Sequence, residues 1–255
     1  GLVYSNILDD PRGALREFRR AADRMPGSAA LWGELGFQHQ ILGEWAEWES
    51  AYVRATALDP RDVNVIFDLG GNSLWLQHRY EDAVAAVNRA LDLAPDVAYP
   101  QVAKGFIYFL WQGRLDTLRA VLERGPESYG PAGSALWWRV QLALWERRPD
   151  ALLALVPEPR QVIFEPQDWY EPALLYTGWA HQLRGDNTAA RSAFAGALVQ
   201  LDSALRGLSG DWRLHASRGL ALAGVGRRAE AMREADWLKA SARYARGTYG
   251  SGPKT

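Results

Sequence analysis

Large apolar residues, small residues and prolines recur along this chain about 35 positions apart. Each member of a first series is matched by a residue of similar character in the next stretch: Trp32 by Phe67, Gly36 by Gly71, Trp45 by Tyr80, Ala55 by Ala90 and Pro60 by Pro95. Within each stretch, apolar positions follow a helical spacing over two segments separated by a turn. The pattern predicts an array of two-helix units in which each unit packs on its neighbours.

The pattern divides the chain into one partial unit, six further units, an irregular segment and a tail. We expect the array to span 1–246, with a partial repeat at 1–27 and repeats at 29–60, 64–95, 100–124, 134–156, 171–201 and 212–240. Residues 157–170 are proline-rich, which predicts a loop packed on one face and not a strand. The Gly- and Ser-rich residues 247–255 are predicted to be disordered. The exact register of the third and fourth repeats stays open.

The second full unit has the clearest motif, namely Phe67, Gly71, Tyr80, Ala83, Ala90 and Pro95. This series resembles the tetratricopeptide repeat (TPR) family over nearly the whole chain. The resemblance implies an all-α fold, a right-handed α-solenoid of antiparallel helix pairs with about six and a half repeats. The unit ends also resemble the TPR tails of some bacterial Ser/Thr protein kinases and adenylate cyclases. With Gly as residue 1 and a first unit entered midway, we expect a piece of a larger bacterial signalling protein.

Composition narrows the function. A net charge of −1 and scattered arginine pairs argue against nucleic-acid binding. The absence of cysteine excludes thiolate metal sites and fits a cytoplasmic protein, and no apolar run is long enough for a membrane span. We find no catalytic constellation, and we expect no enzyme activity, cofactor or metal. His39 and His181 share one repeat position and are expected at helix–helix contacts.

Twelve tryptophans make the chain rich in large aromatics, and many of them fall on one predicted face. In TPR proteins, ligands usually lie on the concave face lined by the first helix of each unit. Carried over to this sequence, the candidate partner-binding positions are Phe37, Gln40, Asp68, Asn72, Trp75, Ile107, Trp111, Trp138, Trp145, Trp179 and Gln182. Because a solvated face should be polar, this aromatic row predicts a groove that binds a protein or peptide segment.

Three alternatives qualify this prediction. The proline-rich segment at 157–170 would fill the groove itself, which would make the chain a structural or self-association module and a possible homo-oligomer. An enclosed aromatic pocket would instead make it a small-ligand sensor. A carboxylate clamp of the TPR type would use Asn72 with Lys104 and Arg139 nearby, but Asp68 stands where a lysine is expected and would repel a carboxylate.

Overall fold

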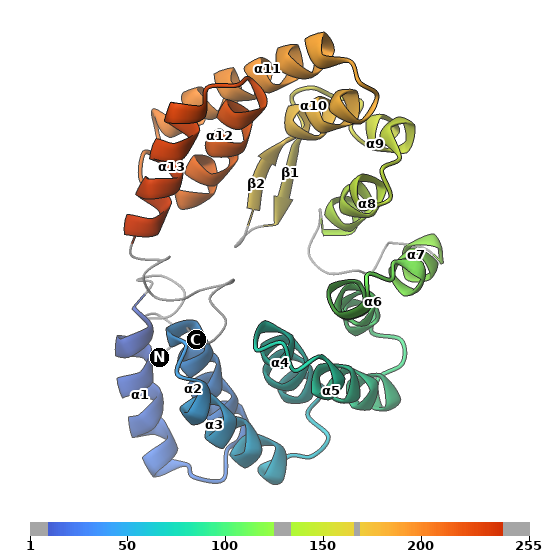
Figure 1. Ribbon diagram of the computed structural model, residues 1–255. Coiled ribbons are helices and arrows are strands. Elements are labelled where there is room, and N and C mark those ends of the chain that lie inside the picture. The colour runs from blue at the N-terminus through green and yellow to red at the C-terminus, as the bar shows by residue number, and fades with distance from the viewer. Residues whose placement is uncertain (1–9, 125–133, 166–168, 242–255) are drawn as a thin grey trace. The chain divides into compact units, whose positions relative to one another are not determined.

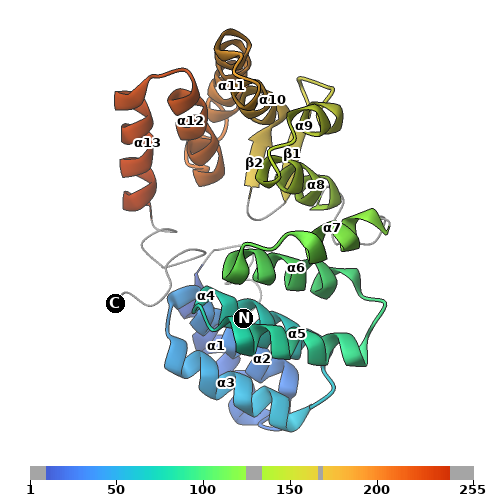
Figure 2. The same cartoon turned by 45° about the vertical axis from the view of Figure 1, so that its right-hand side comes forward.

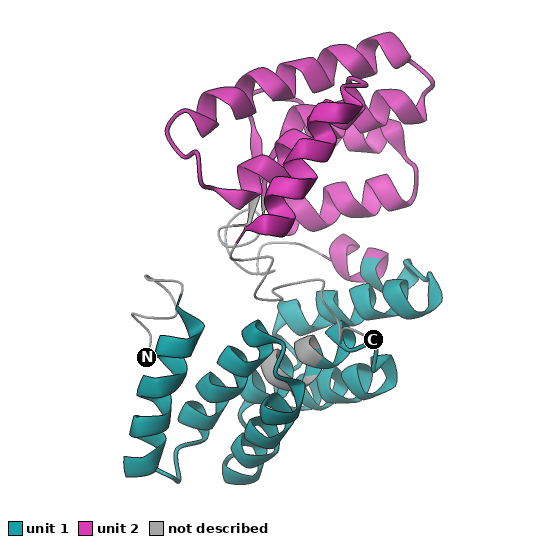
Figure 3. Cartoon of the chain, turned by 60° about the vertical axis from the view of Figure 1, so that its left-hand side comes forward, with its two compact units in different colours: residues 1–118, 242–255 teal, residues 119–241 magenta. Residues whose placement is uncertain are grey.

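The computed structural model describes residues 10–124, 134–165 and 169–241, and only the backbone of 68–70, 72, 73, 134, 164, 165 and 169. The chain forms two compact units, shown in different colours in Figure 3. Unit 1 comprises residues 1–118 and 242–255, and unit 2 comprises residues 119–241. Each unit is a stack of helices, and the predicted tail at 247–255 lies outside the described residues.

Unit 1 is built from consecutive helix pairs. Its elements are α1(Pro11–Arg24), α2(Ala29–Leu42), α3(Trp45–Leu58), the π-helical segment η2(Val65–Asn72), α4(Ser73–Leu76), α5(Tyr80–Leu93), α6(Ala98–Gln112) and the start of α7(Asp116–Glu123). Figure 1 shows α2, α4 and α6 along one side of unit 1, with α3 and α5 along the other. We call α2, η2–α4 and α6 the first helices of their pairs.

Local signals set the helix ends. Asp10 and Ser28 accept hydrogen bonds from backbone N–H groups of the first turns of α1 and α2, at 2.8 and 3.4 Å. Because the first turn of a helix has unpaired N–H groups, these side chains fix where each helix begins. The first helices end in a left-handed residue, for which glycine has the least steric cost; Gly43 and Gly113 take this position with φ of 70° and 68°.

The core of unit 1 lies between the helix pairs. Trp48 stacks on Tyr52 with ring centroids 5.8 Å apart, and Ile66, Val87 and Ala90 are fully enclosed or nearly so. A glycine allows one close approach: a Cβ at Gly105 would lie 2.7 Å from the backbone of Leu118, so α6 and α7 meet almost backbone to backbone.

Unit 2 repeats the scheme. After the rest of α7 come α8(Ser134–Trp145), α9(Pro149–Leu155), β1(Val162–Glu165), β2(Trp169–Pro172), α10(Ala173–Leu183), α11(Asn187–Leu205), α12(Trp212–Gly224) and α13(Arg228–Ala240). The first helices of its pairs are α8, α10 and α12. Phe194 of α11 is fully buried between α10 and α12, where a Cβ added at Gly178 would lie 2.5 Å from its ring.

The segment predicted to be a loop contains an antiparallel two-stranded sheet, so the expectation of no strand is wrong. Ile163 pairs with Glu171 across β1 and β2, and Ala173 N–H donates to Gln161 O at 2.8 Å. Since hydrogen-bonded pairs alternate along such a ladder, Pro172 falls at a position whose N–H would point away from its partner strand. Pro172 is therefore compatible with β2, although prolines in the sequence argued against a strand here.

Candidate functional site

The first helices of unit 1 carry a row of aromatic side chains. Trp75 on α4 packs edge-on against Phe106 on α6, with centroids 5.6 Å apart and an interplanar angle of 81°. Phe109, one turn further along α6, lies 6.5 Å from Phe106. Phe37 on α2 is 39% exposed, and Leu110 on α6 is 38% exposed. We call Phe37, Trp75, Phe106, Phe109 and Leu110 the aromatic face of unit 1.

The sequence pattern did not predict Phe106 and Phe109, because the third repeat is one residue out of the predicted register. Gly71 and Gly105 are one residue closer in sequence than Gly36 and Gly71. Since successive helical residues differ by about 100° around the axis, one residue moves a side chain to another face. The close contact of Gly105 with α7 fixes the rotation of α6, and this places Phe106 where Ile107 was predicted.

Ile107 and Trp111 therefore lie elsewhere. Ile107 is completely buried in the core between the second and third pairs, with Phe67 and Ala90 among its cluster. Trp111 is 38% exposed at the end of α6, stacked 6.5 Å from Tyr80 on one side and 6.5 Å from Tyr108 on the other. The Arg114 guanidinium lies 5.6 Å from the centre of the Tyr108 ring. This stack lies where a first helix turns into its partner.

The remaining candidates of unit 1 are partly described. Gln40 is buried on α2. The side chains of Asp68 and Asn72, and with them the test of a clamp-like site, lie outside the described residues, although their backbone belongs to η2. His39 is buried, as expected for a helix–helix position, and its Nδ1 lies 2.7 Å from a Glu44 carboxylate oxygen.

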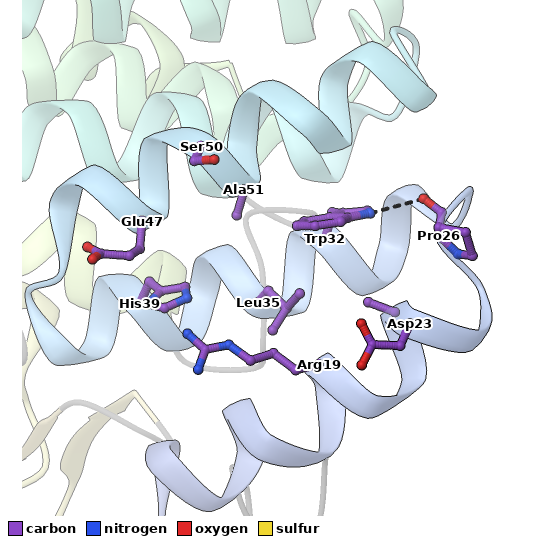
Figure 4. Close-up of a pocket in the computed structure, with 10 residues that line it drawn as sticks. Arg19, Asp23, Pro26, Trp32, Leu35, His39, Glu47, Ser50 and Ala51 are labelled. Carbon is purple, nitrogen blue, oxygen red and sulfur yellow. Dashed lines mark hydrogen bonds between the residues drawn. The ribbon is translucent and has the colours of Figure 1, made fainter.

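A cleft of about 450 Å³ opens between α1, α2 and α3 (Figure 4). Its apolar floor includes Leu35 and the ring of Trp32, whose indole N–H donates to Pro26 O at 3.1 Å. Charged side chains of both signs border it, among them Arg19 and Asp23. This mixture gives the cleft no preference for one sign of charge.

In unit 2 the predicted positions are largely covered. Trp138 is buried and packs edge-on against Trp137, with centroids 4.7 Å apart. Trp179 is half-buried between Tyr176 and Phe194, at centroid distances of 5.2 and 6.4 Å. Trp145 is half-buried at the end of α8, whereas Gln182 on α10 is exposed. Only Gln182 among these four offers an exposed side chain.

The β1–β2 hairpin covers the first helices of unit 2. β1 contacts α8, and β2 contacts α10 and α12, an arrangement visible in Figures 1 and 2. The Ser217 hydroxyl on α12 donates to Tyr170 O at 2.7 Å. The Tyr176 hydroxyl on α10 donates to the Glu171 carboxylate, and Gln141 Nε2 on α8 donates to Tyr176 Oη at 2.9 Å. Gln141, Tyr176 and Glu171 thus form one hydrogen-bonded chain, and Ser217 adds a separate contact to the neighbouring residue of β2.

Burial shifts the pKa values of two groups at this contact, Glu171 and Tyr176. Burial raises the pKa of Glu171, and the hydrogen bond from Tyr176 offsets part of the rise. Burial also raises the pKa of Tyr176 well above its usual range, and the nearby Glu171 carboxylate adds to the shift. Glu171 is thus a half-buried carboxyl group that accepts a hydrogen bond from an uncharged hydroxyl.

The described residues provide neither a metal centre nor a spanning helix. Within 10–124, 134–165 and 169–241, no three His, Asp or Glu side chains are grouped so that they could hold a metal ion. In the same ranges no helix combines the length and apolar character needed to cross a membrane.

No protein-family model matches the sequence, and no curated protein matches it. Among solved structures, the chain is similar to Cut9–Hcn1, an APC/C hetero-tetramer, with a TM-score of 0.56 and 13% identity over 92% of this chain and 45% of that chain. It is also similar to yeast Tom70, with a TM-score of 0.51 and 12% identity over 93% of this chain and 56% of that chain. The chain thus spans about half the length of each.

Both similar structures are TPR-repeat proteins. At 12–13% identity the similarity shows the fold alone. Together with the stacked helix pairs, it confirms the predicted fold class: the chain is an all-α solenoid of TPR-like helix pairs.

Proposed function

We propose that this chain is a non-catalytic interaction module that binds a peptide or protein segment on the aromatic face of unit 1. The observation that carries the proposal is the row of partly exposed aromatic and apolar side chains on consecutive first helices, with Phe37 and Leu110 more than a third exposed. Aromatic rings bury a large area and lose little conformational entropy on binding, so they are favoured at interface centres. Asp68 and Asn72 belong to the same predicted groove, whereas Gln40, predicted with them, is buried.

The proposed cellular role rests on the resemblance of the repeat-unit ends to the TPR tails of bacterial kinases and adenylate cyclases. We propose a cytoplasmic role as one part of a larger bacterial signalling protein, with the partner segment docking as a helix or an extended chain. The TPR-like fold and the cysteine-free composition support this setting.

A photo-crosslinking experiment tests the site. A benzophenone amino acid replaces Phe37 on the aromatic face, and in a matched control it replaces Val53, which is 59% exposed on α3. In cells of the source organism, we expect the Phe37 position to form a crosslink to a defined partner segment that the Val53 position does not form. Trp75→Ala with Phe106→Ala should remove that crosslink from a protein that remains folded by circular dichroism. Equal crosslinking at both positions, or no effect of the double substitution, would refute the proposal.

A second candidate function applies to unit 2. Because its first-helix face is covered by the chain's own hairpin, unit 2 would serve as a structural or self-association part of the array. In that case its tryptophans are core residues of a filled face.

A further inference from the structure

The hairpin contacts of unit 2 have the form of peptide recognition. Two consecutive residues of β2 are held through different groups: Tyr170 through its backbone carbonyl, and Glu171 through its side chain. The donors come from separate helices, Ser217 from α12 and Tyr176 from α10. One donor binds the main chain and the other binds a side chain. In the recognition of extended peptides, main-chain hydrogen bonds provide affinity and side-chain contacts provide specificity.

The strand geometry leaves the carbonyl of Tyr170 available for this contact. The Ala173 N–H donates to Gln161 O, so by the alternation of the ladder Ile163 and Glu171 are the hydrogen-bonded pair. The intervening pair, Phe164 and Tyr170, therefore directs its backbone groups away from the hairpin. Tyr170 O accepts from Ser217 instead, and the same carbonyl of a single extended peptide could accept in the same way.

The site favours a side chain with a hydrogen-bond acceptor at position 171, such as the carboxylate of Glu171. The Tyr176 side chain is fully buried, and its hydroxyl would lose its acceptor if the side chain at position 171 were apolar. Leaving a buried donor unpaired costs free energy, which disfavours such a ligand. Gln141 in turn donates to the Tyr176 oxygen, so the hydroxyl hydrogen is directed at the carboxylate.

We propose that the first-helix face of unit 2 is a peptide-binding site that the chain's own hairpin occupies. Its ligand in trans is an extended segment in which a glutamate follows a residue whose backbone carbonyl accepts from Ser217, as Glu171 follows Tyr170. A two-stranded hairpin is only marginally stable by itself, so the hairpin depends on these helix contacts and yields to a segment that reproduces them. When the hairpin is displaced, it pivots about the junction of β2 and α10, between Pro172 and Ala173.

Fluorescence anisotropy with a labelled peptide of residues 161–173 tests this site on the full chain. Glu171→Ala weakens the resident hairpin and leaves the donors of the site intact. We expect the peptide to bind the Glu171→Ala chain at least tenfold more tightly than the unsubstituted chain, because one charge-assisted contact corresponds to about that factor. A probe peptide with alanine in place of its glutamate should lose this advantage. Glu158→Ala, which removes an exposed carboxylate before the hairpin, is the matched control and should behave as the unsubstituted chain.

Hydrogen exchange on the unsubstituted chain keeps the proposal testable if Glu171→Ala does not fold. A displaceable hairpin opens locally, so the amides of β1 and β2 should exchange well before those of α11. Equal protection of the hairpin and α11 would overturn the proposal, as would equal binding of the glutamate and alanine probes. The test is independent of the site proposed on unit 1, because its ligand is the chain's own sequence.

Discussion

Replacing Arg147 with glycine should stabilise the protein. Arg147 follows α8 and has a left-handed backbone with φ of 55°, where Gly185 after α10 has φ of 79°. An equivalent backbone hydrogen bond closes each turn. The Arg147 N–H donates to Leu144 O, and the Gly185 N–H donates to Gln182 O, each at 3.0 Å. Arg147 thus occupies a glycine position of the repeat.

The size of the effect follows from two opposing terms. A side chain in the left-handed conformation costs about 1–2 kcal/mol, and glycine removes this strain. Glycine also has more freedom in the unfolded chain, which takes back about 0.5–1 kcal/mol. The Arg147 side chain is exposed, and within the described part of the chain its guanidinium has no hydrogen-bond or ion-pair partner. We therefore expect a net gain of about 0.5–1 kcal/mol in the free energy of unfolding.

Urea unfolding followed by circular dichroism measures this difference. The matched control is Gly185→Ala, because an added Cβ there would have no atom within 4 Å and the change is purely conformational. We expect Gly185→Ala to lower the free energy of unfolding by about 1 kcal/mol. If Arg147→Gly is neutral or destabilising while Gly185→Ala behaves as expected, the backbone strain assigned to Arg147 is refuted.

Two further predictions concern unit 2. Gly178→Ala should destabilise by about 1–3 kcal/mol, because its Cβ would meet the ring of Phe194, whereas Gly219→Ala, with 3.3 Å to the nearest atom, should be nearly neutral in the same urea assay. Glu171→Gln should make stability less dependent on pH: the raised pKa of Glu171 means that the folded state binds its proton more tightly, so the free energy of unfolding of the unsubstituted protein falls as pH rises above about 4.5, the ordinary pKa of glutamate, through the raised value. The free energy of unfolding is measured for both proteins between about pH 4 and pH 8. The same dependence on pH in both proteins would contradict this expectation.

The repeat pattern predicts the helices well because it records their packing. Trp48, Ala55 and Phe194 are core positions that recur along the sequence, and all are buried. The pattern is less able to predict which face of a helix is free. A one-residue change in repeat length carries Phe106 into the place expected for Ile107, and only the contact of Gly105 with α7 reveals it.

Turn and strand features escape sequence reasoning for a different reason. Arg147 and His78 adopt the left-handed backbone that glycine takes in other units, so residue identity gives no sign of the turn. The strands β1 and β2 have four residues each, too few for an alternating pattern to be visible beside several prolines. Tertiary contacts with α8, α10 and α12 select the extended conformation.

The aromatic first helices of the two units illustrate why an aromatic row does not by itself identify a binding groove. In unit 2 the aromatic positions are covered: Trp138 is buried against Trp137, and the hairpin fills the face. In unit 1, Phe37 and Leu110 keep more than a third of their surface exposed. The hydrophobic effect favours covering either face, and a covering segment from the same chain avoids the entropy lost when two molecules associate. The same sequence signal therefore fits an internal ligand in unit 2 and an external partner in unit 1, and the crosslinking and peptide-binding experiments examine the two faces separately.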